Sequence, residues 1–321
     1  MKNKIILTAI VLLIAQLSFS QLHWTNVDSI YAPLPPSVHV FKTTDLVDGK
    51  PNIAYYVVAD LKEKKIGFRA DTTYKRRLTP ADFLLKNKDA VVIINTSFFS
   101  FSTHQNLNLV MNDGQLLAYN TSVLGKGKDT LTYRHPLGSA LGITKNRRAD
   151  VAWLYTDSNR LYPIAVQKPI KAVKDSSLVF TYDAFKKSIA SDNTIQASKW
   201  KMHVAVGGGP VVLQNGKVAV SNNEELKFGG KAIEDRHPRT AMGYTSNGKL
   251  ILLVVAGRRT GTAEGATLPQ LGQILADLGC VEGINLDGGG SSTMLINGKP
   301  TIEPSDKEGQ RMVPGVFMIV K

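Results

Sequence analysis

The sequence is poor in cysteine, with one among its 321 residues. A single cysteine cannot form a disulfide within the chain, and it excludes zinc sites built from several cysteines. Cys280 follows a helix-ending glycine and precedes an apolar strand, which predicts a buried core thiol rather than a nucleophile. The sequence also lacks the His-Glu-x-x-His and Gly-x-Ser-x-Gly motifs and any internal repeat. Five histidines have no metal-ligand spacing to one another: His23, His39, His104, His135 and His203.

Long apolar runs are scarce as well, and the N-terminal one is shorter than the roughly 20 residues of a typical membrane span. Residues 1–20 contain Lys2 and Lys4, then an apolar run from Ile5 to Leu17, then small residues before a potential cleavage site. This order predicts a secretory signal peptide, with an uncleaved anchor as the alternative. We therefore expect an exported protein, periplasmic or extracellular, that begins near Gln21 and has no stable membrane span after cleavage.

The overall composition is ordinary for a globular protein, with 43% hydrophobic and 20% charged residues, which excludes wholesale disorder. The chain has 39 Lys and Arg against 26 Asp and Glu, a formal net charge of +13, which suggests an anionic partner. The basic residues are scattered and have no RNA-binding aromatic signature, and export would separate the protein from cellular nucleic acid. We therefore expect no nucleic-acid partner.

The pattern of apolar residues predicts an α+β fold with a mixed, largely antiparallel sheet, hairpins and packed helices. Helices are predicted after the capping residues Thr79 and Thr267, the latter within a C-terminal strand–helix–strand unit, and a weaker one over 183–189. Turn residues between apolar runs predict four hairpins, at Asn112-Asp113-Gly114, Asn215-Gly216, Asn247-Gly248 and Asn297-Gly298. Residues 21–50 are expected to be an irregular N-terminal segment, residues 121–134 an exposed loop, and residues 157–200 a polar excursion from the sheet.

The most distinctive local motif is the run from Asn285 to Ser292, in which Asp287 ends a predicted strand and three glycines follow. Consecutive glycines expose backbone N–H groups and let a ligand approach closely. Asp287 would then sit where sheets of this kind place reactive groups. The alternative is a tight turn that needs positive φ, followed by Ser291–Ile296 as a returning strand. The candidate ligand-binding residues here are Asn285, Gly288, Gly289, Gly290 and Ser291.

Four further segments contain candidate site residues. Gly207-Gly208-Gly209-Pro210 is a second glycine run, for which a hairpin bend is the alternative. The segment 235–240 places Arg239 beside His237, and an arginine suits a bidentate phosphate or carboxylate contact. Arg258 follows a buried strand and precedes a polar loop that contains Glu264, and Asn95 ends the strand predicted over 90–94.

Taken in order, these motifs resemble the phosphodiester glycosidase family over most of residues 53–321. The resemblance includes Asn95 with Phe98-Phe99, the 207–210 run with its hairpin, Arg239–Gly243, Gly257-Arg258, Gly265–Leu268 and Asn285–Ser292. The family usually has glycines where this chain has Thr96 and Ser97, and often an aspartate where it has Ala256. On this basis residues 51–321 are expected to form the catalytic domain.

The resemblance implies hydrolysis of a sugar-1-phosphodiester at the anomeric C1–O bond, releasing a sugar and a phosphomonoester. The anionic leaving group needs cationic and N–H stabilisation, for which the implied residues are Arg239, Arg258, His237 and the glycine N–H groups. A carboxylate must stabilise the oxocarbenium-like transition state or act as nucleophile or base, with Asp287 as first choice and Glu264 as second.

Two other functions remain open at this stage. The same cleft could bind an anionic glycan or wall polymer without hydrolysis, and the absence of a carboxylate at Ala256 favours that alternative. The protein could also process exopolysaccharide at a different bond. No cofactor is required by the motifs; a divalent cation could bind, although no ligand spacing demands one. The sequence gives no indication of the oligomeric state.

Overall fold

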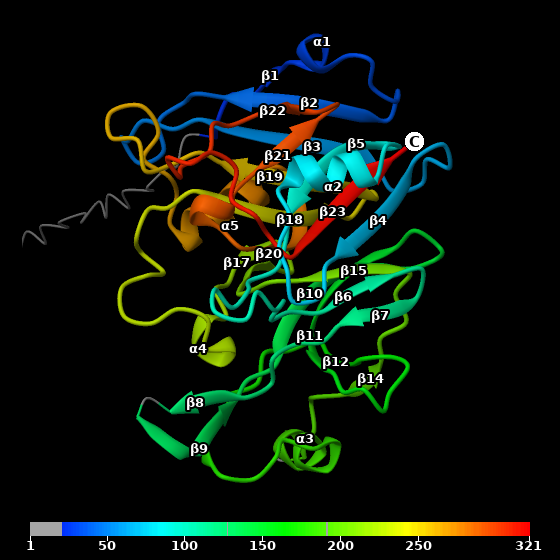
Figure 1. Ribbon diagram of the computed structural model, residues 1–321, viewed down its shortest axis with the longest axis vertical. Helices are drawn as coiled ribbons and strands as arrows, with labels where there is room; N and C mark the ends of the chain where they lie inside the picture. The colour runs from blue at the N-terminus through cyan, green and yellow to red at the C-terminus, as the bar shows by residue number, and fades with distance from the viewer. Residues whose placement is uncertain (1–20, 127, 191) are drawn as a thin grey trace, which may run out of the picture.

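The computed structural model describes residues 21–321 except 127 and 191, and it confirms an α+β fold that is mostly sheet (Figure 1). The predicted signal peptide lies outside the described residues. In the described part of the chain, no helix is long and apolar enough to cross a membrane. The strands form four antiparallel sheets, and the largest of them runs through the middle of the molecule.

The eight-stranded sheet brings together the N-terminal segment and the C-terminal third of the chain. From edge to edge its strands are β1 (Thr25–Asn26), β2 (Val38–Thr43), β3 (Ala54–Asp60), β19 (Lys249–Val255), β18 (Arg239–Thr245), β20 (Cys280–Asn285), β16 (Val211–Gln214) and β17 (Lys217–Val218). β19 and β20 are the two strands of the predicted strand–helix–strand unit. Both pair antiparallel with β18, which lies between them, so β19 and β20 run parallel to each other.

Three smaller sheets complete the fold. The five-stranded sheet is β22 (Lys299–Pro300), β21 (Met294–Ile296), β5 (Ala90–Asn95), β23 (Gly315–Val320) and β4 (Gly67–Thr72). The seven-stranded sheet is β14 (Ala197–Lys199), β12 (Ile164–Val166), β11 (Ala149–Tyr155), β10 (Gly138–Ile143), β15 (Val204–Gly207), β6 (Val110–Asn112) and β7 (Gln115–Ala118). The three-stranded sheet is β13 (Val173–Ser176), β9 (Asp129–His135) and β8 (Leu124–Lys126).

One large hydrophobic core joins the sheets, because alternate residues of each strand point to the same face. It includes Val57 and Leu252 of the eight-stranded sheet, Ile94 and Phe317 of the five-stranded sheet, and Trp153 of the seven-stranded sheet. A second cluster covers the other face of the eight-stranded sheet, where α5 packs. The buried Cys280 belongs to this second cluster, as its sequence position predicts, and burial raises the pKa of its thiol to about 12.

The helices begin where their capping residues predict. α2 (Pro80–Lys86) and α5 (Leu268–Asp277) both have a complete capping box, with Thr79 and Thr267 as the caps. α3 (Tyr182–Ile189) covers the weak helix predicted over 183–189. The remaining short helices are α1 (Asp28–Tyr31), α4 (Asn222–Glu225) and the 3-10 turn η1 (Gly289–Ser291). All four predicted hairpin turns are confirmed, between β6 and β7, β16 and β17, β18 and β19, and β21 and β22.

Three sequence predictions need correction. Residues 21–50 are not irregular, because β2 pairs with β3 along its whole length, and the prolines lie in the turn before it. The expected loop 121–134 instead contains β8 and most of β9, which pair as a hairpin, and β9 also pairs with β13. The segment has no apolar pattern of its own that would predict these strands. β21 begins only at Met294, and it does not return beside β20; it pairs with β5 in the other sheet.

Crossings between sheets position the candidate site. The chain passes from β15 to β16 through residues 208–210, and from β20 to β21 through residues 286–293. A third crossing, residues 96–109, links β5 to β6. The three crossings touch: the Asp287 N–H donates to the Thr96 carbonyl (2.7 Å), and the Gly209 N–H donates to the Asn285 carbonyl (2.7 Å). The motifs that stand out in the sequence therefore converge where three sheets meet.

Candidate active site

Asp287 is held by its backbone, which leaves its side chain free for chemistry. Asn95 donates from Nδ2 to the Asp287 carbonyl (2.6 Å) and accepts at Oδ1 from the Thr240 hydroxyl (2.8 Å) and the Thr293 N–H (3.0 Å). Because Asn95 is fully buried and both ends of its amide are occupied, it clamps the site instead of facing a ligand. The expectation that Asn95 binds substrate is therefore wrong.

The half-buried Asp287 carboxyl has an unusual proton affinity. Burial raises its pKa to about 6, since loss of water disfavours the charged form. The Ser291 side chain, the Arg311 guanidinium and the Gly288 backbone act in the opposite direction and limit the rise. A carboxyl group whose pKa is raised toward neutrality by burial is typical of catalytic acids and bases.

The glycines after Asp287 make room for cations. A Cβ on Gly289 would lie 2.8 Å from Nη2 of Arg258, and one on Gly290 would collide with Arg311 and Asp306. Gly289 also has a φ of +62°, which an L side chain rarely adopts. Its N–H is not free for a ligand, however, because it donates to the Pro238 carbonyl (2.8 Å). The absence of side chains at Gly289 and Gly290 thus leaves space for the guanidinium groups of Arg258 and Arg311. The Gly289 N–H forms a hydrogen bond within the protein.

Arg258 and Arg311 flank this turn and share one carboxylate. Arg311 makes a bidentate contact with Asp306, with Nε at 2.7 Å and Nη2 at 3.0 Å. Arg258 lies 3.8 Å from the same carboxylate, and its side chain is 42% exposed. Two guanidiniums around one carboxylate leave excess positive charge beside Asp287, which suits a phosphate group.

Arg239 and His237 lie nearby but differ from the predicted pair of cations. The Arg239 guanidinium is buried and donates to the carbonyls of Ala266 and Asp235 (both 2.9 Å), and burial lowers its pKa to about 10. Burial, followed by the charges of Arg239 and Arg258, lowers the pKa of His237. A lowered pKa favours the neutral imidazole of His237 over a second cation beside Arg239.

The 207–209 run is structural. The N–H groups of Gly207, Gly208 and Gly209 donate to the carbonyls of Leu109, Ser139 and Asn285 at 2.7, 3.1 and 2.7 Å. A Cβ on Gly208 would lie 2.6 Å from the Asn285 carbonyl oxygen, so close packing between two sheets requires glycine there. The expectation that these three N–H groups bind substrate is wrong, because each is already used.

Glu264 is directed to the N-terminal segment. Its backbone N–H donates to the Pro51 carbonyl (2.9 Å), and its side chain lies 3.9 Å from the Lys50 ammonium. The charged neighbour that influences the Asp287 carboxyl is Arg311 and not Glu264. The structure therefore brings Arg311 to Asp287 and Arg258 to the neighbouring Gly289, and it shows no contact between Asp287 and Glu264.

Three buried polar atoms around the turn after Asn285 have no hydrogen-bond partner within the described chain: Asn285 Oδ1, Ser292 Oγ and His237 Nδ1. Such atoms are uncommon in folded proteins, because an unpaired buried group costs about 1–3 kcal/mol. Their concentration along the strand end and its turn indicates a place that a polar ligand completes. Among the described residues, no group of His, Cys, Asp and Glu is arranged to hold a metal ion.

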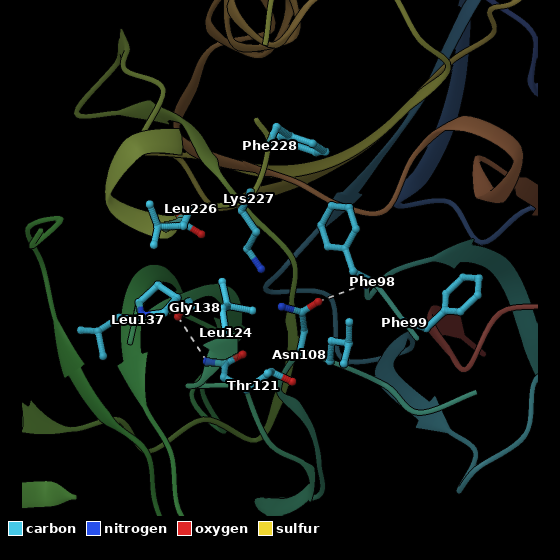
Figure 2. Close-up of a pocket in the computed structure, with 14 residues that line it drawn as sticks. Phe98, Phe99, Asn108, Thr121, Leu124, Leu137, Gly138, Leu226, Lys227 and Phe228 are labelled. Atoms are coloured by element: carbon cyan, nitrogen blue, oxygen red, sulfur yellow. Dashed lines mark hydrogen bonds between the residues drawn. The ribbon is translucent and has the colours of Figure 1, made fainter. Parts of the chain in front are cut away.

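A pocket of about 260 Å³ adjoins the crossing segments. Figure 2 shows the Lys227 side chain pointing into it, with Phe98 on one side and Leu124 and Leu137 on the other. The Phe98 and Phe228 rings meet edge to face at 5.8 Å, and Phe228 lies 5.9 Å from the Arg239 guanidinium.

Sequence reasoning missed three of these residues: Arg311, Asp306 and Lys227. Arg311 and Asp306 lie in the long connection between β22 and β23, and Lys227 follows α4, in stretches without a recognisable motif. Only the excess of positive charge hinted at further cations. The side chains of Thr96 and Ser97, where the chain departs from the glycines of the family pattern, are buried.

Comparison with known proteins places these features in context. Residues 88–320 match the sequence model of a family described as phosphodiester glycosidase. Cattle (Bos taurus) N-acetylglucosamine-1-phosphodiester alpha-N-acetylglucosaminidase is 41% identical over 68 residues, which are 21% of this chain and 12% of that protein. The matched stretch thus spans about an eighth of that relative's length.

Two solved structures share the fold. The auto-inhibited catalytic domain of the zebrafish N-acetylglucosamine-1-phosphodiester alpha-N-acetylglucosaminidase has a TM-score of 0.57 and 20% identity, and the match covers 91% of this chain and 86% of that one. A hypothetical protein from Synechocystis has a TM-score of 0.59 and 16% identity, over 94% of this chain and 68% of that one.

Proposed function

Because the chain belongs to the phosphodiester glycosidase family, we propose that it hydrolyses a sugar-1-phosphodiester at the anomeric C1–O bond. The observation that carries the proposal is the Asp287 carboxyl, whose pKa is raised toward neutrality, together with Arg311 beside it and Arg258 at the adjoining glycine turn. We include in the proposal that the protein is exported and acts in the periplasm or outside the cell. The proposal assigns no cofactor, since arginines supply the positive charge.

In this proposal the C1–O bond breaks with its electron pair moving to the phosphate oxygen, and a water oxygen forms the new bond to C1. Arg258 and Arg311 stabilise the departing phosphomonoester, which is already a good leaving group. The Asp287 carboxylate stabilises the positive charge that develops at C1, or acts as nucleophile or base toward water. The products are a free sugar and a phosphomonoester, and one proton is released from the water.

A panel of chromogenic substrates tests the proposal. The full chain from residue 21 should release free sugar and nitrophenyl phosphate from a sugar-1-phosphate nitrophenyl diester, with nitrophenolate colour appearing only when a phosphatase is added, and it should not cleave the matching nitrophenyl glycoside. Colour without added phosphatase would mean that the phosphate–nitrophenol bond is cleaved instead of the C1–O bond. Release from the glycoside alone would favour a hydrolase acting on another bond. Binding of the diester without release would favour a non-catalytic glycan-binding module.

The pH dependence of kcat/KM tests the state of Asp287. Since the proposed role requires the carboxylate, kcat/KM should rise about tenfold per pH unit below pH 6 and level off above it. The rise of kcat/KM with pH below pH 6 should be absent from the residual activity of the Asp287→Asn variant. A profile that instead falls as the pH rises through 6 would assign Asp287 as a general acid and contradict the proposed role.

Arg258 provides a second test of phosphate stabilisation. Arg258→Met keeps the length of the side chain but removes the charge, and it should lower kcat/KM for the diester by roughly 10- to 1,000-fold. Arg148→Met is a suitable control, because Arg148 is exposed and forms no ion pair with the described residues. Equal rates for the two variants would exclude Arg258 from the reaction.

A further inference from the structure

The pocket beside Asp287 has features that the proposed reaction does not use. Its walls are mainly apolar, with Phe98, Phe228, Leu124 and Leu137, and the polar lining includes Asn108, Thr121 and the carboxylate of Glu225. Arg258 and Arg311 do not line it, so Lys227 is its one cation within the described residues (Figure 2). The group that binds here is therefore held separately from the phosphate.

Both walls of the pocket adjoin the strand end that leads to Asp287. Phe98 follows Thr96 by two residues, and the Thr96 carbonyl accepts the Asp287 N–H at 2.7 Å. On the other wall, the Cε atom of Lys227 lies 2.8 Å from where a Cβ on Gly209 would be. These contacts connect both walls of the pocket to the backbone around Asp287, and the proposal below places the sugar ring of the substrate in this pocket.

Lys227 forms no ion pair within the described chain, although the charge of the neighbouring Glu225 partly offsets the effect of burial on its pKa. No carboxylate in the described chain lies within ion-pair distance of its ammonium, which lies 5.2 Å from the centre of the Phe98 ring. The nearby Glu225 does not pair with it, since both Glu225 oxygens accept hydrogen bonds from neutral donors. Burial lowers the pKa of Lys227, so the empty pocket disfavours the charge that an anionic ligand would stabilise.

We propose that this pocket binds the sugar ring of the substrate and that the ring carries an acidic group that pairs with Lys227. The aromatic faces of Phe98 and Phe228 suit the apolar C–H face of a pyranose, and a volume of about 260 Å³ suits one ring better than a chain. The proposed ligand class is a sugar with an acidic substituent, either a carboxylate or a phosphate. This inference rests on the proposed function.

Matched substrates test the acidic preference. Methyl phosphodiesters of glucose 1-phosphate, glucuronic acid 1-phosphate and glucose 1,6-bisphosphate differ only at C6. The native protein should show kcat/KM at least tenfold higher for one of the acidic substrates than for glucose, and the better one identifies the acidic group. In Lys227→Met this ratio should fall to about one, while Lys231→Met, an exposed neighbour, should keep the native ratio. A native ratio near one, or a ratio unchanged in Lys227→Met, would overturn the proposal.

A binding experiment separates this proposal from the proposed reaction. Calorimetry on the Asp287→Asn protein, with glucose, glucuronate and glucose 6-phosphate as probes, requires no turnover. Tighter binding of an acidic probe that is lost on adding Lys227→Met supports the pocket even if no diester is hydrolysed. Hydrolysis of the diesters with equal binding of all three probes would sink the pocket proposal and leave the reaction standing. Native circular dichroism of each variant establishes that it is folded.

Discussion

Replacing Asp287 with asparagine should lower kcat for a sugar-1-phosphodiester by roughly 10²- to 10⁴-fold. The amide retains the size of the side chain but can carry no negative charge, so it neither stabilises an oxocarbenium-like centre nor activates water. The backbone clamp should survive, because Asn95 and Thr96 contact only main-chain atoms of residue 287. Near-normal turnover in the variant would remove Asp287 from the reaction.

The same substitution should not destabilise the protein, and this separates a catalytic effect from a folding defect. Because burial raises the pKa of Asp287 to about 6, the folded state binds its proton more tightly than the unfolded chain. The stability contributed by this group is present below about pH 4 and is lost as the pH rises through 6. Asp287→Asn removes that loss, so denaturant unfolding at pH 8 should give equal or higher stability, by up to roughly 1–3 kcal/mol.

Much of the fold follows from local signals in the sequence. Capping boxes at Thr79 and Thr267 fix the starts of two helices, and Asn-Gly turns fix hairpins, because these signals act over a few residues. The signals fail where pairing is long-range. β2 lies in a proline-bearing segment, and its register with β3 is visible only when the two strands are side by side.

The candidate site shows the same division. The Asp287 motif and Arg258 stand out in the sequence, and the family match over residues 88–320 confirms the resemblance that they suggested. The role of each glycine run could not be deduced from the sequence. A glycine whose N–H is free for a ligand looks the same in the sequence as one whose N–H donates to a distant backbone carbonyl. Gly208 and Asn95 are examples: their partners, Ser139 in β10 and Asp287 in the crossing after β20, are far from them in the sequence. Arg311 reaches Asp287 through a long connection with no motif.

Glu225 supports the site by joining two sheets, and its loss should be the most destabilising change considered for this protein. Its buried carboxylate accepts from the Trp153 indole (3.0 Å) and the Ser139 hydroxyl (2.8 Å) of the seven-stranded sheet. It also accepts from the Val211 N–H (3.0 Å) of the eight-stranded sheet and from the Ser221 hydroxyl (2.6 Å). A Cβ on Gly209 would collide with this carboxylate, so the crossing 208–210 is packed against it.

Glu225→Ala would leave these buried donors without an acceptor and open a void between the sheets. Since each unsatisfied buried group costs about 1–3 kcal/mol, and partial repacking and water recover some of this, the free energy of unfolding should fall by about 3–5 kcal/mol. Glu225→Gln keeps one acceptor oxygen and should lose less. Urea unfolding measures both, with Glu234→Ala as the exposed control, which should stay within about 0.5 kcal/mol of the native protein. A loss below about 1 kcal/mol for Glu225→Ala would mean that close packing of the glycines alone holds the crossing 208–210, and that the carboxylate does not fix the strand end beside Asp287.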